Sequence, residues 1–324
     1  MKYTVVLTGP ILQEGLDLLL ARKDITLVQA PDWSEKIAAR LLPTAHAILV
    51  RTHPLPRTLL AQAPVLRVVS RFGVGVDNVD WRYLSERDIP LCVTTGANAD
   101  SVAEQTLLFM LAMAKDLHSA QAAVCEGKWT WREQHSAQEL RGKTALLIGF
   151  GNIGRAVATL CSAFGMHVIA WSRSEQTNLP PNVTMTKDFR AHLPEADFIS
   201  LHLPHTPETH HLLSLDDMTR LKPGACIVNT GRGSLLDERV LLHALESGLL
   251  GGVGLDVFEH EPPDLHSPLL QHPRSFFTPH NAGLTHECMT RMSVLSARNI
   301  LDALDGCLNP QMIFNGKRVS SPSV

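Results

Sequence analysis

Three polar side chains in the second half of the chain are of the types that reduction of a keto group requires. Arg232 and His280 each follow a predicted strand, and a carboxylate, Glu259 or Glu261, lies between them in the sequence. An arginine clamps a substrate carboxylate and keto oxygen through its fork of donors. A histidine protonates the developing alkoxide, and a carboxylate orients that histidine and favours its charged form. These residues therefore predict a site that acts on a 2-keto acid.

Each of these residues taken alone has an ordinary explanation. An isolated arginine or glutamate on a loop is usually solvated, and His280 is one of sixteen histidines. The cluster His202, His205, His210 and His211 suggests a metal, but its spacing matches no common zinc site. We interpret the cluster as a polar loop between a strand and a helix, and expect no metal.

The stretch Thr144–Gly154, TALLIGFGNIG, predicts how a cofactor is held. A short apolar run is followed by Gly149, Gly151 and Gly154, and then by the helical pattern RAVATLCSAFG. The first glycine allows a tight turn, the second lets backbone approach a pyrophosphate, and the third lets helix and strand pack closely. The helix N-terminus then faces the phosphates. A dinucleotide site is favoured over a structural glycine turn or a methyltransferase loop.

The residues after the next predicted strand, His167–Trp171, indicate which dinucleotide is bound. NAD-selective sites carry an acidic residue about 20 positions beyond the glycines, where it binds the ribose 2′-hydroxyl. This chain instead has Ser172, Arg173 and Ser174. A hydroxyl and a guanidinium suit a 2′-phosphate, although Glu175 is a possible substitute acid. We predict NADP(H) in preference to NAD(H), with NAD(H) possible.

The wider pattern predicts an α/β protein, because short apolar strands alternate with amphipathic helices. In the first hundred residues we expect strands at Tyr3–Leu7, Ala45–Val50 and Leu66–Ser70, and helices at Ile11–Ala21 and Ser34–Leu42. In the second half six strands are expected: Thr144–Ile148, His167–Trp171, Phe198–Leu201, Ala225–Asn229, Gly252–Asp256 and Ser275–Thr278. The crossover helices include Arg155–Phe164 and Glu238–Ser247. This pattern is typical of two doubly wound parallel-sheet domains.

Two long helices are expected outside this alternation. Ala99–Leu117 would link the domains, with Ser101 and Glu104 as a capping box, and Thr285–Leu304 would follow the last strand. The polar segment after the linker carries Trp129 and Trp131, which either contact a second subunit or cover the protein's own surface.

Composition excludes several classes of function. The net charge of −3 over 324 residues gives no reason to expect binding to nucleic acid or to an anionic membrane. The start, MKYTVVLTGP, does not look like a signal peptide, and the longest apolar run, Thr106–Ala114, is too short to span a bilayer. Six scattered cysteines without a C-x-x-C pair indicate a reducing, cytoplasmic setting.

Several motifs in this order resemble the D-isomer-specific 2-hydroxyacid dehydrogenases, particularly their hydroxypyruvate/glyoxylate reductase and phosphoglycerate dehydrogenase branches. They are RFGVGVDNVD (71–80), VAEQ (102–105), the glycine stretch, LHLPHTPETHHLL (201–213), NTGRGSLLDE (229–238), GLDVFEHEP (254–262) and PHNAGLTHE (279–287). The resemblance covers nearly the whole chain. It implies a Rossmann cofactor domain at 99–284 and a flavodoxin-like substrate domain made of 1–98 and 285–324. It also implies a homodimer.

The resemblance further implies individual roles. Arg232, Glu261 and His280 would be the catalytic trio, with Glu261 chosen over Glu259 because it directly precedes Pro262. Backbone at Val74 and Gly75 would bind the substrate carboxylate. The implied cofactor positions, beyond the three glycines and the Ser172–Ser174 segment, are Asn152, Ile153, Leu203, Pro204, Thr209, Thr230, Asp256, His280 and Gly283.

The leading hypothesis is thus a reductase of a small 2-keto acid, with hydroxypyruvate or glyoxylate favoured and phosphohydroxypyruvate still open. Arg51, Arg71 and Arg132 could each reach a substrate phosphate or simply be solvated; of these, Arg51 is our candidate substrate-binding residue. The alternative from another class is a nucleotide-sensing interaction protein, because transcriptional corepressors resemble the same family.

Overall fold

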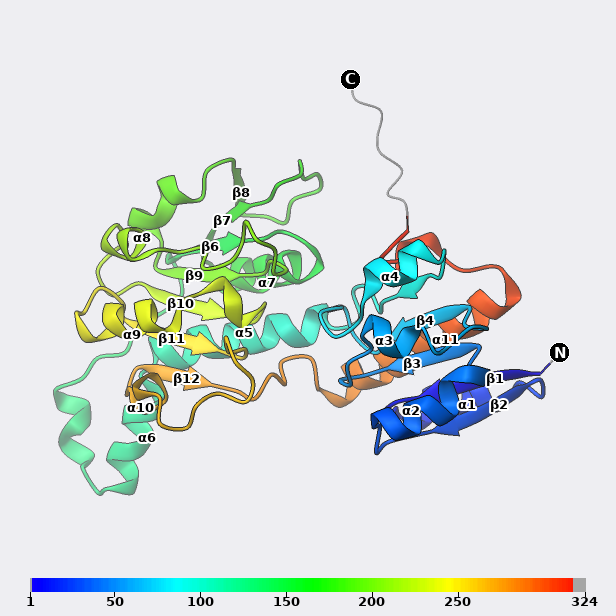
Figure 1. Ribbon diagram of the computed structural model, residues 1–324. Helices are drawn as coiled ribbons and strands as arrows, with labels where there is room; N and C mark the ends of the chain where they lie inside the picture. The colour runs from blue at the N-terminus through cyan, green and yellow to red at the C-terminus, as the bar shows by residue number, and fades with distance from the viewer. Residues whose placement is uncertain (1, 317–324) are drawn as a thin grey trace. The chain divides into compact units, whose positions relative to one another are not determined.

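The structure, a computed structural model, describes residues 2–316 of the chain. They form two compact units, which are described separately. Unit 1 combines the N-terminal part through Asn98 with the segment from Leu284 onward, and unit 2 is Ala99–Gly283. Each unit contains one parallel sheet with helices packed on it (Figure 1). The predicted α/β class with two doubly wound sheets is confirmed.

The sheet of unit 1 has the strand order β2-β1-β3-β4-β5, which is the order of flavodoxin-like folds. Its strands are β1 (Tyr3–Leu7), β2 (Ile25–Gln29), β3 (Ala47–Val50), β4 (Val68–Arg71) and β5 (Leu91–Cys92). Its helices are α1 (Gln13–Leu20), α2 (Glu35–Leu41), α3 (Arg57–Leu60), α4 (Trp81–Glu86) and α11 (His286–Asp305), with 3₁₀ turns η1 (Leu42–Thr44) and η5 (Pro310–Met312).

Helix α11 belongs to unit 1 although it follows unit 2 in the sequence. It packs on α1, β3 and β4 (orange to red in Figure 1). A Cβ on Gly15 of α1 would lie 2.5 Å from the carbonyl oxygen of Ser293, so the two helices approach as closely as backbones allow. The hydroxyl of Ser70 donates to the carbonyl oxygen of Ser296 across the buried contact. The C-terminal segment thereby completes the core of the N-terminal one.

The sheet of unit 2 has the order β12-β11-β10-β9-β6-β7-β8. Counted from β6, this is the Rossmann order 3-2-1-4-5-6 with a seventh strand added. The strands are β6 (Thr144–Ile148), β7 (His167–Trp171), β8 (Val183–Thr186), β9 (Phe198–Leu201), β10 (Cys226–Asn229), β11 (Gly252–Leu255) and β12 (Ser275–Phe277). The helical elements are α5 (Ala99–Ala114), α6 (Leu117–Cys125), η2 (Trp129–Glu133), α7 (Asn152–Ala163), η3 (Arg190–Glu195), α8 (Leu215–Thr219), η4 (Gly233–Leu235), α9 (Glu238–Glu246) and α10 (Pro268–Gln271).

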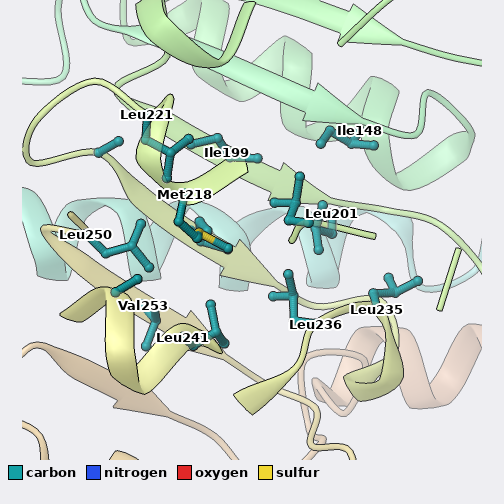
Figure 2. Close-up of a cluster of buried hydrophobic side chains, with 14 of the residues drawn as sticks. Ile148, Ile199, Leu201, Met218, Leu221, Leu235, Leu236, Leu241, Leu250 and Val253 are labelled. Atoms are coloured by element: carbon teal, nitrogen blue, oxygen red, sulfur yellow. The ribbon is translucent and has the colours of Figure 1, made fainter. Parts of the chain in front are cut away.

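Two apolar clusters hold the helices of unit 2 on its sheet. In one, Ile199 and Val253 of the sheet face Met218 of α8 and Leu241 of α9 (Figure 2). Full burial of each such side chain is worth about 1.5–3 kcal/mol. The other cluster includes Phe109 of α5, which a Cβ on Gly254 would approach to 2.6 Å. These contacts hold the strand ends, and the loops that follow them, in place.

The elements differ from the predictions where local signals were weak. Strands β2, β5 and β8 were not predicted, because they are short or only partly buried, so unit 2 has seven strands where six were expected. The expected helix Ala99–Leu117 is wrong at its end, since Asp116 has a φ of 46° and separates α5 from α6. The capping box is also wrong. Ser101 lies inside α5, and its hydroxyl donates to the carbonyl oxygen of Ala282.

Candidate functional site

A glutamate and a histidine form a close pair at the carboxyl edge of the unit 2 sheet. Nδ1 of His280 lies 2.8 Å from Oε2 of Glu261. The histidine side chain is 51% exposed and the glutamate side chain 39% exposed, so the pair is accessible. With Nδ1–H donated to the carboxylate, the second ring nitrogen, Nε2, is the one that can exchange a proton with another molecule.

The loop that carries His280 is fastened to a buried carboxylate. Asp256, at the end of β11, is 1% exposed. Its oxygens accept hydrogen bonds from the hydroxyl of Thr278 at 2.6 Å and from the backbone N–H groups of Asn281 and Ala282 at 2.9–3.2 Å. The backbone N–H of His280 donates to the carbonyl oxygen of Asp256 at 2.8 Å. Together these bonds maintain a backbone with a φ of 51° at His280.

A close backbone approach joins the loop of Arg232 to the loop of Glu261. A Cβ on Gly233 would lie 1.9 Å from the carbonyl group of Phe258, so only glycine fits there. The backbone N–H of Phe258 in turn donates to Oε1 of Glu261 at 3.2 Å. Arg232 was a candidate from the sequence, but the role of Gly233 was not predicted. The repeated glycine in GRG was the available signal.

The electrostatics of the pair favour an ionised glutamate. Burial by itself raises the pKa of Glu261. The hydrogen bond and charge of His280, the N–H of Phe258 and the positive charge of Arg232 outweigh burial, and hold the pKa below its usual range. Glu261 is therefore poised to stabilise a protonated His280.

The other candidate carboxylate, Glu259, has a different partner. Its Oε1 lies 2.8 Å from Nε2 of His211. The rings of His210 and His211 are stacked with centroids 3.9 Å apart, and His205 lies against His210. Among residues 2–316, no group of three or more His, Cys, Asp or Glu side chains is arranged to hold a metal ion.

The glycine turn after β6 has the shape that a pyrophosphate requires. A Cβ on Gly149, whose φ is 109°, would lie 2.4 Å from the carbonyl oxygen of His202, and one on Gly154 would lie 2.2 Å from that of Gly149. Gly151, by contrast, would meet nothing within 4 Å. It begins α7, whose first residues are Asn152 and Ile153. The open side of the turn thus exposes the helix N-terminus, and the residues fit a bound dinucleotide.

The histidine beneath this turn is neutral near neutral pH. Burial lowers the pKa of His202 to about 4. Its Nε2 lies 3.0 Å from the hydroxyl of Ser200, and its Nδ1 is buried with no hydrogen-bond partner in the part of the chain that the structure describes. The sequence placed His202 in a polar loop, and its packing under the glycine turn was not foreseen.

The segment after β7 is organised by Gln176. The side-chain amide nitrogen of Gln176 lies 3.1 Å from Oγ of Ser172 and 2.9 Å from Oγ of Ser174. Its amide oxygen accepts a hydrogen bond from Nη2 of Arg155 at 2.6 Å. Arg173 is exposed, and its charge contributes, after local hydrogen bonds, to a lowered pKa of Glu208 in the loop after β9.

Comparison with known proteins identifies the family. Residues 107–282 match the model described as the D-isomer-specific 2-hydroxyacid dehydrogenase, NAD-binding domain. The chain belongs to the D-isomer-specific 2-hydroxyacid dehydrogenase family. The prediction of an NAD(P)-dependent dehydrogenase of this family is thereby confirmed.

Some relatives within the family match along nearly their whole length. The chain is 31% identical over 331 residues to a glyoxylate reductase of Thermococcus litoralis, a match that covers 99% of this chain and 100% of the relative. It is 34% identical over 307 residues to a hydroxypyruvate reductase of Thermotoga maritima, covering 94% and 99%. A crystal structure of an NADPH-dependent glyoxylate/hydroxypyruvate reductase from Sinorhizobium meliloti has a TM-score of 0.81 and 28% identity, covering 94% and 95% of the two chains.

Some of the positions implied by the 2-hydroxyacid dehydrogenase family are engaged within unit 2 itself. Thr230 is buried, and its hydroxyl donates to that of Thr106, which donates onward to the carbonyl oxygen of Val102. The hydroxyl of Thr209 donates to the carbonyl oxygen of Pro204 and closes the loop after β9. The hydroxyl hydrogens of both threonines are thus used within unit 2.

The other cofactor positions implied by the family differ in how exposed they are. Pro204 is exposed, and Leu203 and Gly283 are partly exposed. Asp256, expected at the nicotinamide amide, uses both carboxylate oxygens on the His280 loop. Sequence reasoning missed that anchoring function.

The substrate positions implied by the family lie in unit 1, in the loop after β4. Val74 is 36% exposed and Gly75 is partly exposed. The side-chain amide of Asn78 donates to the carbonyl oxygens of Arg51 and His53, which joins this loop to the one after β3. Nη1 of Arg51 donates to the carbonyl oxygen of Pro10 at 3.1 Å.

The two tryptophans of the polar segment behave differently. Trp131 is partly exposed and stacks on His135 with ring centroids 4.2 Å apart. Trp129 is 64% exposed, and Arg132 lies over its ring.

A cavity of about 390 Å³ adjoins the catalytic candidates of unit 2. It is lined by Glu261 and His280 together with apolar side chains that include Phe258, Leu270 and Phe277. The pair thus lies at the rim of a mostly apolar space. Low polarity there strengthens the attraction between a carboxylate and an imidazolium.

Proposed function

We propose that this protein reduces a small 2-keto acid to the D-2-hydroxy acid, with hydroxypyruvate or glyoxylate as the favoured substrate. The single observation that carries the proposal is the 2.8 Å pair of His280 and Glu261, within the electrostatic reach of Arg232. The names of the relatives from Thermococcus litoralis and Thermotoga maritima support the substrate class.

In the proposed mechanism His280 acts as the general acid. Glu261 holds Nδ1–H and stabilises the imidazolium, so Nε2–H donates its proton to the keto oxygen as that oxygen becomes an alkoxide. In the reverse direction Nε2 takes the proton from the hydroxyl group. A bound nicotinamide coenzyme supplies or accepts the hydride. Arg232 holds the substrate carboxylate and keto oxygen through its guanidinium.

The loop of Val74 and Gly75 is proposed to bind the substrate carboxylate through backbone N–H groups. Successive N–H groups in a glycine-containing loop make an anion-binding concavity. Arg51, joined to this loop through Asn78, is the candidate contact for a larger or phosphorylated substrate.

The proposed coenzyme is NADP(H) in preference to NAD(H). No carboxylate occupies position 172, where it would repel a 2′-phosphate, and Ser172, Arg173 and Ser174 offer hydroxyl and guanidinium donors instead. The Sinorhizobium meliloti neighbour is named as NADPH-dependent, which supports the proposal.

We also propose a cytoplasmic homodimer. Exposed large apolar side chains lie on α5, α6 and η2, at Leu108, Leu117, Val124 and Trp129, and such surface is typical of a subunit interface. No disulfide joins the six cysteines, all of which lie in the part of the chain that the structure describes, as expected in a reducing compartment. No helix among residues 2–316 is long and apolar enough to cross a membrane.

The deciding experiment is a steady-state assay of the purified protein with glyoxylate, hydroxypyruvate and phosphohydroxypyruvate, each with NADPH and NADH. The proposal expects turnover with at least one unphosphorylated acid and a higher kcat/KM with NADPH. Tight coenzyme binding without turnover of any acid would instead favour a nucleotide-sensing interaction protein. A kcat/KM highest for phosphohydroxypyruvate would move the assignment to the phosphoglycerate dehydrogenase type.

A further inference from the structure

A chain of side-chain hydrogen bonds leads from α7 to the segment after β7. Arg155 begins it, because Nη2 donates to the amide oxygen of Gln176, while Nη1 and Nη2 also donate to the carbonyl oxygens of Asn178 and Thr177. Its guanidinium lies 4.9 Å from the ring centroid of Phe150. Four contacts of one side chain, each with a different partner residue, therefore hold the start of this chain in place.

The direction of these bonds is determined by the arginine. A guanidinium has only donors, so the group that faces Arg155 must be the amide oxygen of Gln176. The amide nitrogen then faces the hydroxyls of Ser172 and Ser174, 3.1 and 2.9 Å away, and it can only donate to them. An amide that would otherwise be free to turn over is thus locked in one orientation.

We propose that Arg155 and Gln176 are positioning residues that make Ser172 and Ser174 donors to a 2′-phosphate, and so determine coenzyme selectivity. The inference rests on the proposed preference for NADP(H). Each hydroxyl has one hydrogen and two lone pairs. Because Gln176 occupies a lone pair on both, neither hydrogen is used on Gln176. The two hydroxyl oxygens lie 3.4 Å apart, a long contact in which one serine can donate to the other. A charged ligand that only accepts is a stronger acceptor than a neutral hydroxyl and draws that hydrogen away as well.

This arrangement favours a phosphate dianion over a ribose hydroxyl. The dianion accepts from both serines, and bonds to a charged acceptor are shorter and about twice as strong as those between neutral groups. A 2′-hydroxyl gains less, since it must share its lone pairs between two donors and its own hydrogen meets no carboxylate at position 172. This chain of hydrogen bonds from Arg155 through Gln176 to the two serines, here called the relay, thus explains how serine hydroxyls rather than a cluster of cations select a phosphate.

The test measures dissociation constants of the purified protein for 2′,5′-ADP and 5′-AMP by calorimetry. These two ligands differ only in the 2′-phosphate, and they need no turnover. We expect the unmodified protein to bind 2′,5′-ADP at least tenfold more tightly. Gln176→Met should reduce that ratio roughly threefold to tenfold, in line with the loss of oriented hydrogen bonds, with the constant for 5′-AMP unchanged.

Two further variants separate hydrogen-bond direction from charge and from folding. Gln176→Glu should bring the ratio close to one, because the serines would then donate to the new carboxylate. Thr177→Glu adds the same charge at the exposed neighbouring position and should change the ratio much less. Equal effects of Gln176→Glu and Thr177→Glu on the ratio would mean that only the added charge matters, and would overturn the relay.

The double variant tests whether Arg155 works through Gln176. Arg155→Met should lower the ratio about as much as Gln176→Met. The double variant should lower the ratio no further than either single variant does. Additive losses would mean that Arg155 acts on the phosphate directly, which contradicts the relay. A ratio of one in the unmodified protein would overturn the NADP(H) preference itself. A high ratio that no variant changes would leave the preference standing and overturn the relay alone.

Discussion

The loop of His280 and the segment Ser172–Gln176 stand at strand ends of the same sheet, but they are held in different ways. The His280 loop is bound to the Asp256 carboxylate, which is almost completely buried. The serine segment is held by hydrogen bonds among partly or fully exposed side chains. Bonds to a buried charge are individually stronger than bonds among groups that water also solvates.

This difference suggests which property of the protein is easily altered. The geometry around the proton-donating group depends on a buried charge, whose loss is costly to folding. Coenzyme choice depends on surface side chains that can be exchanged at little cost to stability. We therefore expect changes near His280 to affect rate and stability, and changes near Ser172 to affect selectivity alone.

The largest effect is expected from His280→Ala. General acid–base help is worth roughly 10²–10⁴-fold, so kcat should fall by that factor while the dissociation constant for NADP⁺ stays within a few-fold. Single-turnover kinetics and coenzyme titration measure the two quantities. His260→Ala is the matched control, since His260 is an exposed histidine beside Glu261. A kcat that survives in the His280 variant, with chemistry limiting the rate, would remove His280 from the mechanism.

The second largest effect is expected from loss of the Asp256 carboxylate, which holds the His280 loop in place. Asp256→Asn keeps the shape but places an N–H group against the N–H of Ala282, and it removes the charge that the loop donors face. We expect the free energy of unfolding to fall by about 2–3 kcal/mol and kcat to fall by roughly tenfold or more, as measured by denaturant unfolding and steady-state kinetics.

The control for this change is Asp264→Asn. The Asp264 carboxylate accepts a backbone N–H from His266 on an exposed turn, and its loss should cost less than about 1 kcal/mol. Similar costs for the two variants would contradict the contrast between a buried and an exposed anchor.

The stability of the protein should be sensitive to acid through His202, which packs beneath the glycine turn after β6. Its pKa is about 4 in the folded protein and about 6.5 when exposed, so the unfolded state binds more protons between these values and stability falls as the pH is lowered through that range. The loss is at most about 3 kcal/mol and smaller to the extent that the ring is exposed. Denaturant unfolding from pH 7 to pH 4 should show a shallower decline for His202→Gln, whereas His260→Gln should match the unmodified protein. An unchanged profile in the His202 variant would refute this.

The smallest expected effects concern the serine segment. Arg173→Ala should reduce the preference of kcat/KM for NADPH by about tenfold, through loss of one charge-assisted contact, and Ser172→Asp should reverse the preference. Neither should change the free energy of unfolding by more than about 0.5 kcal/mol. A large loss of stability in either variant would show that this segment is as firmly integrated as the His280 loop.

Much of this protein follows from sequence alone, because the decisive signals are local. The glycine spacing, the apolar runs of β6, β7 and β9, and the polar residues after the strands all lie within a few positions of one another. They were enough to predict the α/β class, the two sheets, the family and the candidate trio. Local patterns suffice there because a parallel strand and its following loop are encoded contiguously.

The remaining features depend on residues that meet only after folding. Asp256 and Ala282 are 26 positions apart, Arg155 and Gln176 are 21 apart, and Gly233 contacts Phe258 across two strand ends. Strands β2, β5 and β8 form because a neighbouring strand offers them hydrogen bonds, even though their own apolar signal is weak. Which donor faces which acceptor, and which glutamate reaches His280, is decided by backbone positions in three dimensions. Residue type sets only what a group is able to do.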